Sequence, residues 1–410
     1  MPAATVLPTS NVVIRFPPPS TTPDIVEETY QLLELPPEIL KQVESSTSAF
    51  PLTIKGRPSD DAVLCTNEST FLLRTVSISN SLLILRPPEV EKQRAELEIR
   101  DTCHEVLECV PISGNLERIR MVLKGSAWEG MGGGKRKRGE DEEGKKRRRY
   151  TKAQLESIIL ASDKEIEQGL RERNVIECEG RLLLLPSISL QPLLSLILAL
   201  LTIHSITSLP PIISAPINPI IDALEEDHEI SEELTRGVMS LYGEIIGQEW
   251  NCRINDIVRE VGKGLVESLR GQARSSDMFI DDWKTEVGPD YSDLVDLKLL
   301  KVSISFIARP RHRVKTKGEY LLDPAPPSHF TSSSPILTPF PSSTLPLHPP
   351  TRFADLFLTR PRWRPEDMSP FLKGLTRDGD QKGRDKLVVK FVRVVKEKDG
   401  GIWWYPRRSA

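Results

Sequence analysis

Short apolar runs separated by turn residues dominate the chain before residue 90 and predict a small sheet. The runs lie between Gly, Pro, Asp and Asn, which is typical of short strands. They cover residues 32–35, 52–56, 62–66, 71–77 and 82–85. Such a sheet leaves backbone groups at its edges unpaired unless it closes on itself or a partner pairs with it. We therefore expect residues 26–125 to form a β-rich domain that contributes to a shared, intermolecular barrel.

Helical patterns replace the strands after residue 150. Thr151 with Gln154, and Ser162 with Glu165, are two capping boxes that each open a short amphipathic run. The second run leads into residues 175–183, which we read as two short strands about a turn. Helix, helix and hairpin is the order of a winged helix, so we predict one over residues 151–216.

The same kind of pattern continues towards the carboxyl terminus. Helices are expected from 219 to 243 and from 253 to 270, with shorter ones at 281–287 and 292–300, and residues 302–308 and 320–322 resemble a wing hairpin. We predict an α+β chain in which residues 1–25 are disordered and tandem winged helices follow the β-rich domain. The remaining boundaries are a second winged helix at 217–322, a Pro/Ser-rich linker at 323–350 and a third winged helix at 351–410.

One uncharged segment has the length of a membrane span. Residues 182–221 contain no Asp, Glu, Lys or Arg, and such a length suffices to cross a bilayer. Prolines interrupt the segment and leave 193–203 as its longest uninterrupted apolar helix, which would measure roughly 16 Å, half the hydrocarbon thickness. We predict a buried core helix and no membrane association.

Two basic clusters flank an acidic spacer within the linker expected at 126–150. The spacer would repel a phosphate backbone that the clusters attract, which argues against continuous contact with DNA. A nuclear import signal, direct DNA binding and a solvated linker without function are the three interpretations. The position on a tether between folded modules favours import and a nuclear location. The import residues would be Lys135, Arg136, Lys137, Arg138, Lys145, Lys146, Arg147, Arg148 and Arg149.

The last module is basic, although the whole chain carries a net charge of −3. Residues 352–410 hold 15 Lys or Arg against 8 Asp or Glu. Four of the cations recur at steps of four, three and three, which would place them on one face of a helix. The β-branched content of the segment argues for a strand instead, but we predict the helix. The residues expected to bind DNA are Lys386, Lys390, Arg393, Lys396, Arg407 and Arg408.

Motifs of catalysis are missing from the sequence. Residues 132–135 look like a fragment of a phosphate loop, but Glu129 replaces its first glycine and Arg136 its magnesium-binding hydroxyl. The six histidines show no paired spacing and the five cysteines form no C-x-x-C pair, so no metal site is indicated. G-x-S-x-G and H-E-x-x-H are also absent. We expect no enzymatic activity and no cofactor.

Several segments together resemble one known family. Residues 30–35, 54–56, 61–66 and 77–85 look like the amino-terminal domain of the sister chromatid cohesion proteins of the Dcc family. Residues 155–185 are similar to that family's first winged helix, and residues 352–357 and 363–367 resemble its carboxy-terminal one. The resemblance covers most of residues 28–408. The basic insertion, the proline-rich linker and the β-branched segment 386–396 depart from it.

The resemblance implies an adaptor subunit of an alternative replication factor C clamp loader. The amino-terminal strands would share a barrel with the small chromosome-transmission-fidelity subunit and the tail of the large ATPase subunit. The winged helices would contact single- and double-stranded DNA and DNA polymerase epsilon, and other subunits would act on the sliding clamp. The residues expected at the barrel interface are Ile54, Lys55, Gly56, Val63, Leu64, Leu83 and Ile84.

Two other classes of function fit the same modules. A sequence-specific transcription regulator would discriminate between duplexes by roughly 4 kcal/mol or more. A purely structural nuclear protein would keep the barrel but use the basic face only as a solvated surface. DNA binding by the purified protein, and its dependence on sequence, separates the three hypotheses.

Overall fold

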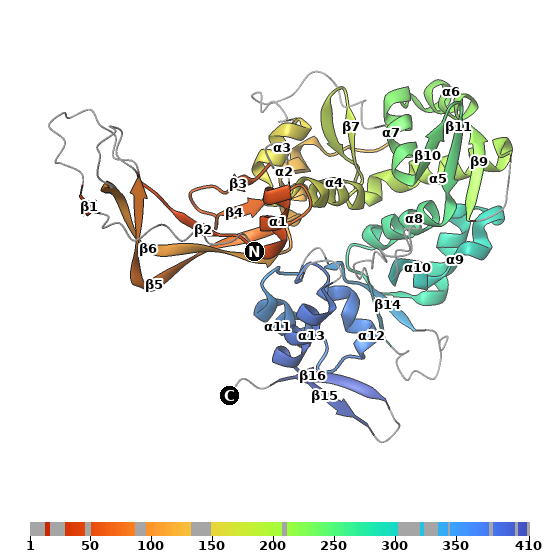
Figure 1. The fold of residues 1–410 in the computed structure, drawn as a ribbon. Coiled ribbons are helices and arrows are strands. Elements are labelled where there is room, and N and C mark those ends of the chain that lie inside the picture. Colours follow the sequence, from red (N-terminus) through yellow and green to blue (C-terminus); the bar gives the residue numbers. More distant parts are fainter. Residues whose placement is uncertain are drawn as a thin grey trace, which may run out of the picture. The chain divides into compact units, whose positions relative to one another are not determined.

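The computed structural model describes residues 13–16, 29–45, 51–86, 96–132, 149–206, 211–301, 320–323, 335–342, 345–376, 380–397 and 401–407. The chain forms two compact units, Met1–Ile112 and Ser113–Ala410. Strands dominate the first unit, and helices with small sheets form the second (Figure 1). The predicted α+β class is confirmed.

The first unit is built on one twisted sheet. Its path runs β1-β6-β5-β4-β3, and β2 also pairs with β6. Its elements are β1 Val13–Arg15, β2 Leu32–Glu34, α1 Pro37–Ser45, β3 Thr53–Lys55, β4 Val63–Cys65, β5 Thr70–Arg86 and β6 Glu96–Ile112. Where two strands were expected at 71–77 and 82–85, the structure has the single strand β5, which shifts register against β6 between the two runs.

A small core holds this unit together near one end of the sheet. Ile39 of α1 packs with Leu64 and Phe71, and all three side chains are at most 3% exposed. Tyr30 donates its backbone N–H to Asp101 Oδ2 at 2.9 Å, and this bond lowers the pKa of Asp101. The core thus lies over β4 and the first residues of β5, with Leu33 of β2 and Cys109 of β6 packed against it.

The second unit repeats one order of elements: helix, strand, helix, helix, two-stranded hairpin. In the described residues the order occurs four times, over 113–185, 186–253, 254–340 and 345–407, which we call the first to fourth repeats. In the first and fourth repeats the single strand is reduced to one bridge, Ala127 to Leu184 and Trp363 to Trp404.

The first repeat begins earlier than the predicted boundary at residue 125. Helix α2 packs against β8 and so belongs to the second unit. Both predicted capping boxes are confirmed: Thr151 with Gln154 opens α3, and Ser162 with Glu165 opens α4. The elements are α2 Glu117–Leu123, the 3-10 helix η1 Lys124–Ser126, α3 Lys152–Ile158, α4 Asp163–Glu172, β7 Val175–Cys178 and β8 Arg181–Leu184.

The second repeat starts with the apolar helix α5 Ser187–His204, which by length and composition alone could cross a membrane. Leu190, Leu193, Leu194, Ile197 and Leu198 of α5 are 0% exposed, so the prediction of a core helix is confirmed. The remaining elements are β9 Ile212–Pro216, α6 Ile217–His228, α7 Glu232–Tyr242, β10 Gly243–Ile246 and β11 Glu249–Arg253.

The third repeat corrects one prediction. The hairpin expected between residues 302–308 and 320–322 is not tested, because 302–308 lie outside the described residues; in the described residues Tyr320–Asp323 pairs with Ile336–Pro339. The linker expected at 323–350 therefore contributes a strand, with Leu337 fully buried and Pro339 at the strand end, where prolines are tolerated. The elements are α8 Ile254–Ser268, β12 Arg274–Ser275, α9 Ser276–Val287, η3 Pro289–Leu294, α10 Leu297–Lys301, β13 Tyr320–Asp323 and β14 Ile336–Pro339.

The fourth repeat has a core of its own, built around Phe353, Trp363 and Phe371. Trp363 exchanges two backbone hydrogen bonds with Trp404, which fixes the hairpin against the start of α12. The elements are α11 Pro349–Thr359, α12 Pro365–Met368, η5 Ser369–Leu372, α13 Gln381–Phe391, β15 Val392–Lys396 and β16 Ile402–Pro406.

Candidate nucleic-acid and partner interfaces

Exposed cations line helix α13 and the hairpin that follows it. Lys386 and Lys390 lie on α13, Arg393 and Lys396 lie on β15, and Arg407 follows β16. All five side chains are exposed. Arg408, the sixth residue expected to bind DNA, lies outside the described residues.

The prediction of one continuous helix through residue 396 is wrong. Helix α13 ends at Phe391 and β15 begins with Val392. Valines at 392, 394 and 395 prefer the pleated conformation, where their branched side chains lose less freedom than in a helix. Arg393 and Lys396 are three positions apart on a strand, so they point to opposite faces of the hairpin. The cations form two surfaces rather than one row.

Arginines and aromatic rings alternate on one face of the hairpin. The guanidinium of Arg362 lies 4.4 Å from the centroid of the Trp403 ring, and that of Arg364 lies 5.2 Å from it. Arg393 lies 5.7 Å from the ring of Tyr405, its partner across the strands. Cations at such distances from aromatic faces are held in place by the ring quadrupole. In such a surface the guanidinium groups can donate to phosphates, and the aromatic rings can stack on bases.

Glu397 orders one end of this surface. Arg362 Nη1 donates to Glu397 Oε1 at 2.6 Å, and the Tyr405 hydroxyl donates to the same oxygen at 3.1 Å. The hydrogen bond with Tyr405 and the charge of Glu397 raise the pKa of Arg362. Arg362 and Arg364 were not among the residues expected to bind DNA. The signal for them in the sequence is the set of three arginines at alternate positions 360, 362 and 364.

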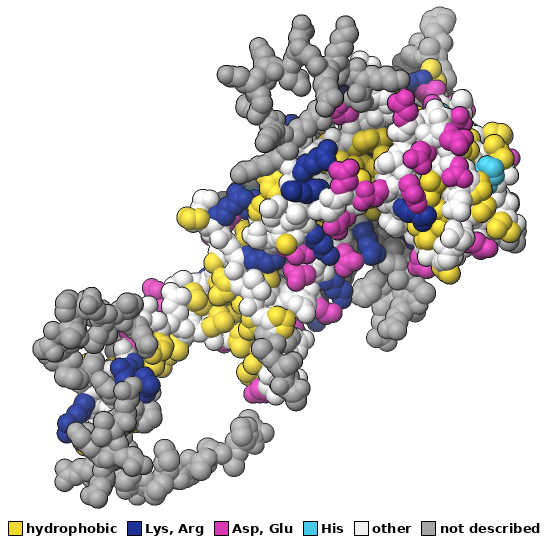
Figure 2. Space-filling model, turned by 90° about the horizontal axis from the view of Figure 1, so that it is seen from above, with side chains coloured by type: hydrophobic (Ala, Val, Ile, Leu, Met, Phe, Trp, Pro, Cys, Tyr) yellow, Lys and Arg dark blue, Asp and Glu magenta, His cyan; other side chains and the backbone are white. Residues whose placement is uncertain are grey.

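The corresponding helix of the second repeat, α7, has a different environment. A Cβ added to Gly237 would lie 2.7 Å from Ile176 Cδ1, so α7 packs closely on β7. Glu233 accepts the backbone N–H of Glu179 at 2.6 Å. The second repeat holds nine Asp or Glu against two Arg, and acidic side chains gather on the right of Figure 2. Helix α7 therefore lacks both the open face and the positive charge that phosphate contacts need, whereas α13 packs only its half-buried Leu387, Val388 and Phe391 against the core of the fourth repeat.

In the first unit, the residues expected at a partner interface fall into different classes of burial. Ile54 is 62% exposed and Leu83 is 45% exposed, whereas Val63 and Leu64 are at most 2% exposed and support the sheet from within. Gly56 is exposed, and Lys55 and Ile84 are half-buried. The structure thus brings Ile54 and Leu83 to the surface and excludes Val63 and Leu64 from direct contact with a partner.

The last residues of β5, from Leu82 to Arg86, expose apolar side chains on both faces of the sheet. Leu82 and Leu83 are consecutive, so their side chains point to opposite faces, yet each is 45% exposed. Leu85, Val13 and Ile14 add further exposed apolar surface in the same sheet. Sequence analysis missed Leu82 and Leu85 as interface candidates. Exposed apolar surface of this kind is typical of protein interaction sites.

The basic block expected to direct nuclear import lies outside the described residues, except for Arg149. That residue is exposed and forms an ion pair with Glu179 at 3.3 Å. No group of three or more His, Cys, Asp or Glu that could hold a metal ion occurs in the part of the chain that the structure describes.

Comparison with known proteins identifies the family. The sequence pattern of the sister chromatid cohesion protein Dcc1 family matches residues 30–372. The chain is 25% identical to the probable sister chromatid cohesion protein DCC1 of Dictyostelium discoideum over 406 residues, which cover 92% of this chain and 94% of the relative. It is 21% identical to the DCC1 protein of Saccharomyces cerevisiae over 408 residues, 90% of this chain and 94% of the relative.

A mammalian relative matches over a shorter stretch. The DCC1 protein of Mus musculus is 29% identical over 161 residues, which cover 36% of this chain and 37% of the relative. The family pattern extends well beyond that stretch and covers most of both units. The chain therefore belongs to the sister chromatid cohesion protein Dcc1 family.

Proposed function

We propose that this protein is a noncatalytic adaptor subunit of an alternative clamp loader that acts in DNA replication and sister chromatid cohesion in the nucleus. The family match over residues 30–372 carries the proposal. Its partners would be the small and large chromosome-transmission-fidelity subunits, DNA polymerase epsilon and, indirectly, the sliding clamp. No cofactor would be required, since other subunits would hydrolyse ATP.

The sheet of the first unit would complete a barrel with strands from the two chromosome-transmission-fidelity subunits. Its path ends at β1 and β3, which do not pair with each other in the described residues. An open edge of this kind accepts a further strand. The leucines at 82, 83 and 85 would be covered in the assembled barrel, which accounts for their exposure in the isolated chain.

The repeats of the second unit would be winged helices, because each has their order of helix, strand, two helices and hairpin. The fourth repeat would bind DNA, through the helix α13 and the hairpin β15–β16. Its third helix is basic and exposes Lys386 and Lys390, unlike α7 of the second repeat. Binding would rest mainly on phosphate contacts by Lys386, Lys390 and Arg393, and therefore depend on salt more than on sequence.

Affinity purification from nuclear extract tests the adaptor function directly. The protein is expected to recover the chromosome-transmission-fidelity subunits in stoichiometric amounts. Leu83→Glu places a charge among the exposed apolar residues at the end of β5 and should abolish that recovery. Ser77→Glu, at an exposed position on the same strand, should not. Recovery without any clamp-loader subunit would contradict the proposal.

Reversing two charges on the fourth repeat is expected to weaken DNA binding. In Lys390→Glu with Arg393→Glu, two phosphate contacts are lost, so the slope of log affinity against log salt should flatten by about two. Fluorescence anisotropy with unrelated duplexes over a range of NaCl concentrations measures the slope. All duplexes should be affected about equally.

Lys152→Glu with Lys284→Glu provides the matched control. Both lysines are exposed, on α3 and α9, and the variant changes the net charge by the same amount. It should leave the slope within about half a unit of the wild type, since no phosphate contact is removed. An unchanged slope in the first variant would refute the DNA-binding face. A preference of roughly 4 kcal/mol for one duplex would favour a sequence-specific regulator.

A further inference from the structure

Residues of the first three repeats meet in one large hydrophobic core that the fourth repeat does not enter, and the first repeat also has a second core of its own around Ile119, Leu155 and Ile166. Ile176 of the first repeat, Trp250 of the second and Trp283 of the third belong to the same buried cluster. The core of the fourth repeat is separate, and β13 of the third repeat joins it through Leu321. Tyr320, the neighbouring residue, belongs to the large core instead and donates its hydroxyl to the Leu297 carbonyl at 2.8 Å. Strand β13 therefore lies at the junction of the two cores.

A buried polar network joins the first three repeats a second time. Glu260 Oε1 of the third repeat accepts hydrogen bonds from Asn174 Nδ2 and Ser187 Oγ, both at 2.7 Å. The Tyr242 hydroxyl donates to Asn174 Oδ1 at 3.0 Å. These groups come from all three repeats and none is more than 7% exposed. The shared core and the network together make the first three repeats one rigid body.

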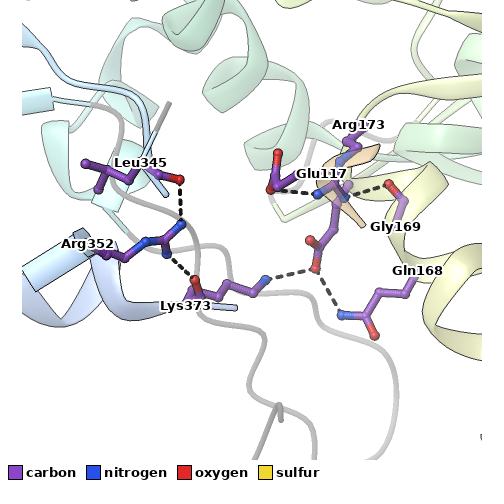
Figure 3. Close-up of polar contacts among 8 residues, drawn as sticks. Glu117, Gln168, Gly169, Arg173, Leu345, Arg352 and Lys373 are labelled. Carbon is purple, nitrogen blue, oxygen red and sulfur yellow. Dashed lines mark hydrogen bonds and ion pairs between the residues drawn. The ribbon is translucent and has the colours of Figure 1, made fainter. Parts of the chain in front are cut away.

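The fourth repeat meets this body through an ion pair. Lys373 Nζ lies 2.9 Å from Glu172 Oε1 at the end of α4, and Gln168 Nε2 donates to the same oxygen at 3.0 Å (Figure 3). The side chains of Lys373 and Glu172 are 12% and 24% exposed. Leu321 and Phe340 of the third repeat pack in the core of the fourth repeat, where the Phe340 ring lies 5.2 Å from the ring of Phe371. The third repeat therefore holds the fourth at the junction, and the ion pair joins the fourth repeat to the first.

Both ends of the ion pair are held firmly. On one side, Arg352 donates to the carbonyl of Lys373 at 2.8 Å. On the other side, Arg173 forms an ion pair with Glu117 at 2.8 Å and donates to the Gly169 carbonyl at 3.1 Å. Burial disfavours the charged form of Glu172, but Lys373 and Gln168 outweigh it and lower the pKa of Glu172. The pair is thus preformed, and salt can weaken it because water reaches part of it.

We propose that the fourth repeat is a hinged module that turns about β13 and is latched onto the first repeat by Lys373 and Glu172. The exposed cations of α13 and of the hairpin belong to this module. The state of the latch therefore sets the direction in which they face. The proposal concerns the second unit alone and stands whether or not the fourth repeat binds DNA.

A zero-length carbodiimide cross-linker, which joins a lysine to a carboxylate in direct contact, tests the latch in the full chain. Mass spectrometry should detect an amide between Lys373 and Glu172 at 50 mM NaCl. Its yield should fall roughly fivefold at 500 mM, because salt shifts the module towards the released state, in which the two side chains are apart. The internal control is the pair Lys152–Glu156, which helix α3 holds together at 4.0 Å and whose yield should fall much less. Equal falls for the two pairs, or no 172–373 product, would refute the latch.

Charge reversal supplies the second test. Glu172→Lys should release the fourth repeat and raise the radius of gyration measured by small-angle X-ray scattering. Adding Lys373→Glu restores an ion pair of opposite sense and should return it to the wild-type value. Glu167→Lys, at an exposed position on the same helix, is the control and should change nothing. A radius unchanged in Glu172→Lys, or not restored in the double variant, would overturn the proposal, provided that circular dichroism shows the native helix content.

Discussion

Replacing Arg352 by methionine is expected to destabilise the fourth repeat while the first three repeats keep their stability. The Arg352 guanidinium is 2% exposed and donates to four backbone carbonyls. The acceptors are the carbonyls of Pro346 at 2.6 Å, Lys373 at 2.8 Å, Leu345 at 3.0 Å and Phe371 at 3.1 Å. Methionine fills a similar volume but removes the donor from the buried carbonyls of Leu345 and Phe371 and from the part-buried ones of Pro346 and Lys373. Each such group costs about 1 to 3 kcal/mol, so the free energy of unfolding should fall by at least about 3 kcal/mol.

Hydrogen exchange followed by mass spectrometry measures this effect repeat by repeat. Protection of the amides of α11 should drop by about 100-fold or more, which corresponds to about 3 kcal/mol. Protection of α8 should be unchanged, because its residues belong to the separate core of the first three repeats. Arg352→Lys, which keeps the charge but can reach fewer of the four carbonyls, should lie between the wild type and Arg352→Met. Equal loss of protection in α8 and α11 would contradict the separate cores.

The elements that sequence analysis predicted correctly are those fixed by local chemistry. Thr151 and Ser162 each cap a helix with a partner three residues away, so the sequence alone contains the whole interaction. The buried helix α5 follows from its leucines, because no polar face could turn to solvent. The hairpin β7–β8 follows from the turn at Glu179 and Gly180, which both have positive φ.

The elements that sequence analysis missed depend on distant partners. Ile336–Pro339 looks like part of a proline-rich linker, and becomes a strand only because β12 and β13 pair with it from both sides. The repeats were also hard to count, because equivalent helices carry different residues. Helix α7 begins with Glu232 and Glu233, whereas α13 carries Lys386 and Lys390. The repeats share an order of helices and strands, but equivalent helices carry opposite charges. The sequence therefore shows no repeating pattern of residues along the chain.

Of the candidate DNA site, the sequence alone indicated the cations but not the elements that carry all of them. The excess of lysine and arginine after residue 352 is a matter of composition, so the exposed cations of α13 could be named in advance. The end of α13 at Phe391 could not be placed, because the spacing of the cations and the β-branched valines favoured different elements. The stacking of Arg362 and Arg364 on Trp403 requires the fold to bring together residues 41 and 39 positions apart in the sequence.

Replacing Glu260 by glutamine is expected to destabilise the first three repeats in a way that depends on pH. Burial of Glu260 disfavours its charge, but Lys263, Arg259 and the hydrogen bond from Ser187 outweigh burial and lower the pKa of Glu260 to about 2. The ordinary value is 4.5, and a difference of about 2.5 units corresponds to about 3 kcal/mol. Because the folded pKa is the lower one, this stabilisation is complete above about pH 4.5 and is lost as pH falls towards 2.

Urea unfolding of the full chain, followed by the fluorescence of the buried tryptophans, checks this dependence. At pH 7 Glu260→Gln should be less stable than the wild type by about 3 kcal/mol, and Lys263 should then lack its partner at 3.0 Å. Below pH 4.5 the difference should shrink, because the Glu260 carboxyl takes up a proton in the unfolded wild type, whereas in the folded protein it takes one up only near pH 2. Glu167→Gln removes an exposed ion pair and should cost less than about 1 kcal/mol at every pH. A constant difference between Glu260→Gln and the wild type from pH 7 to pH 3 would mean that Glu260 contributes through its shape and hydrogen bonds, and not through its charge.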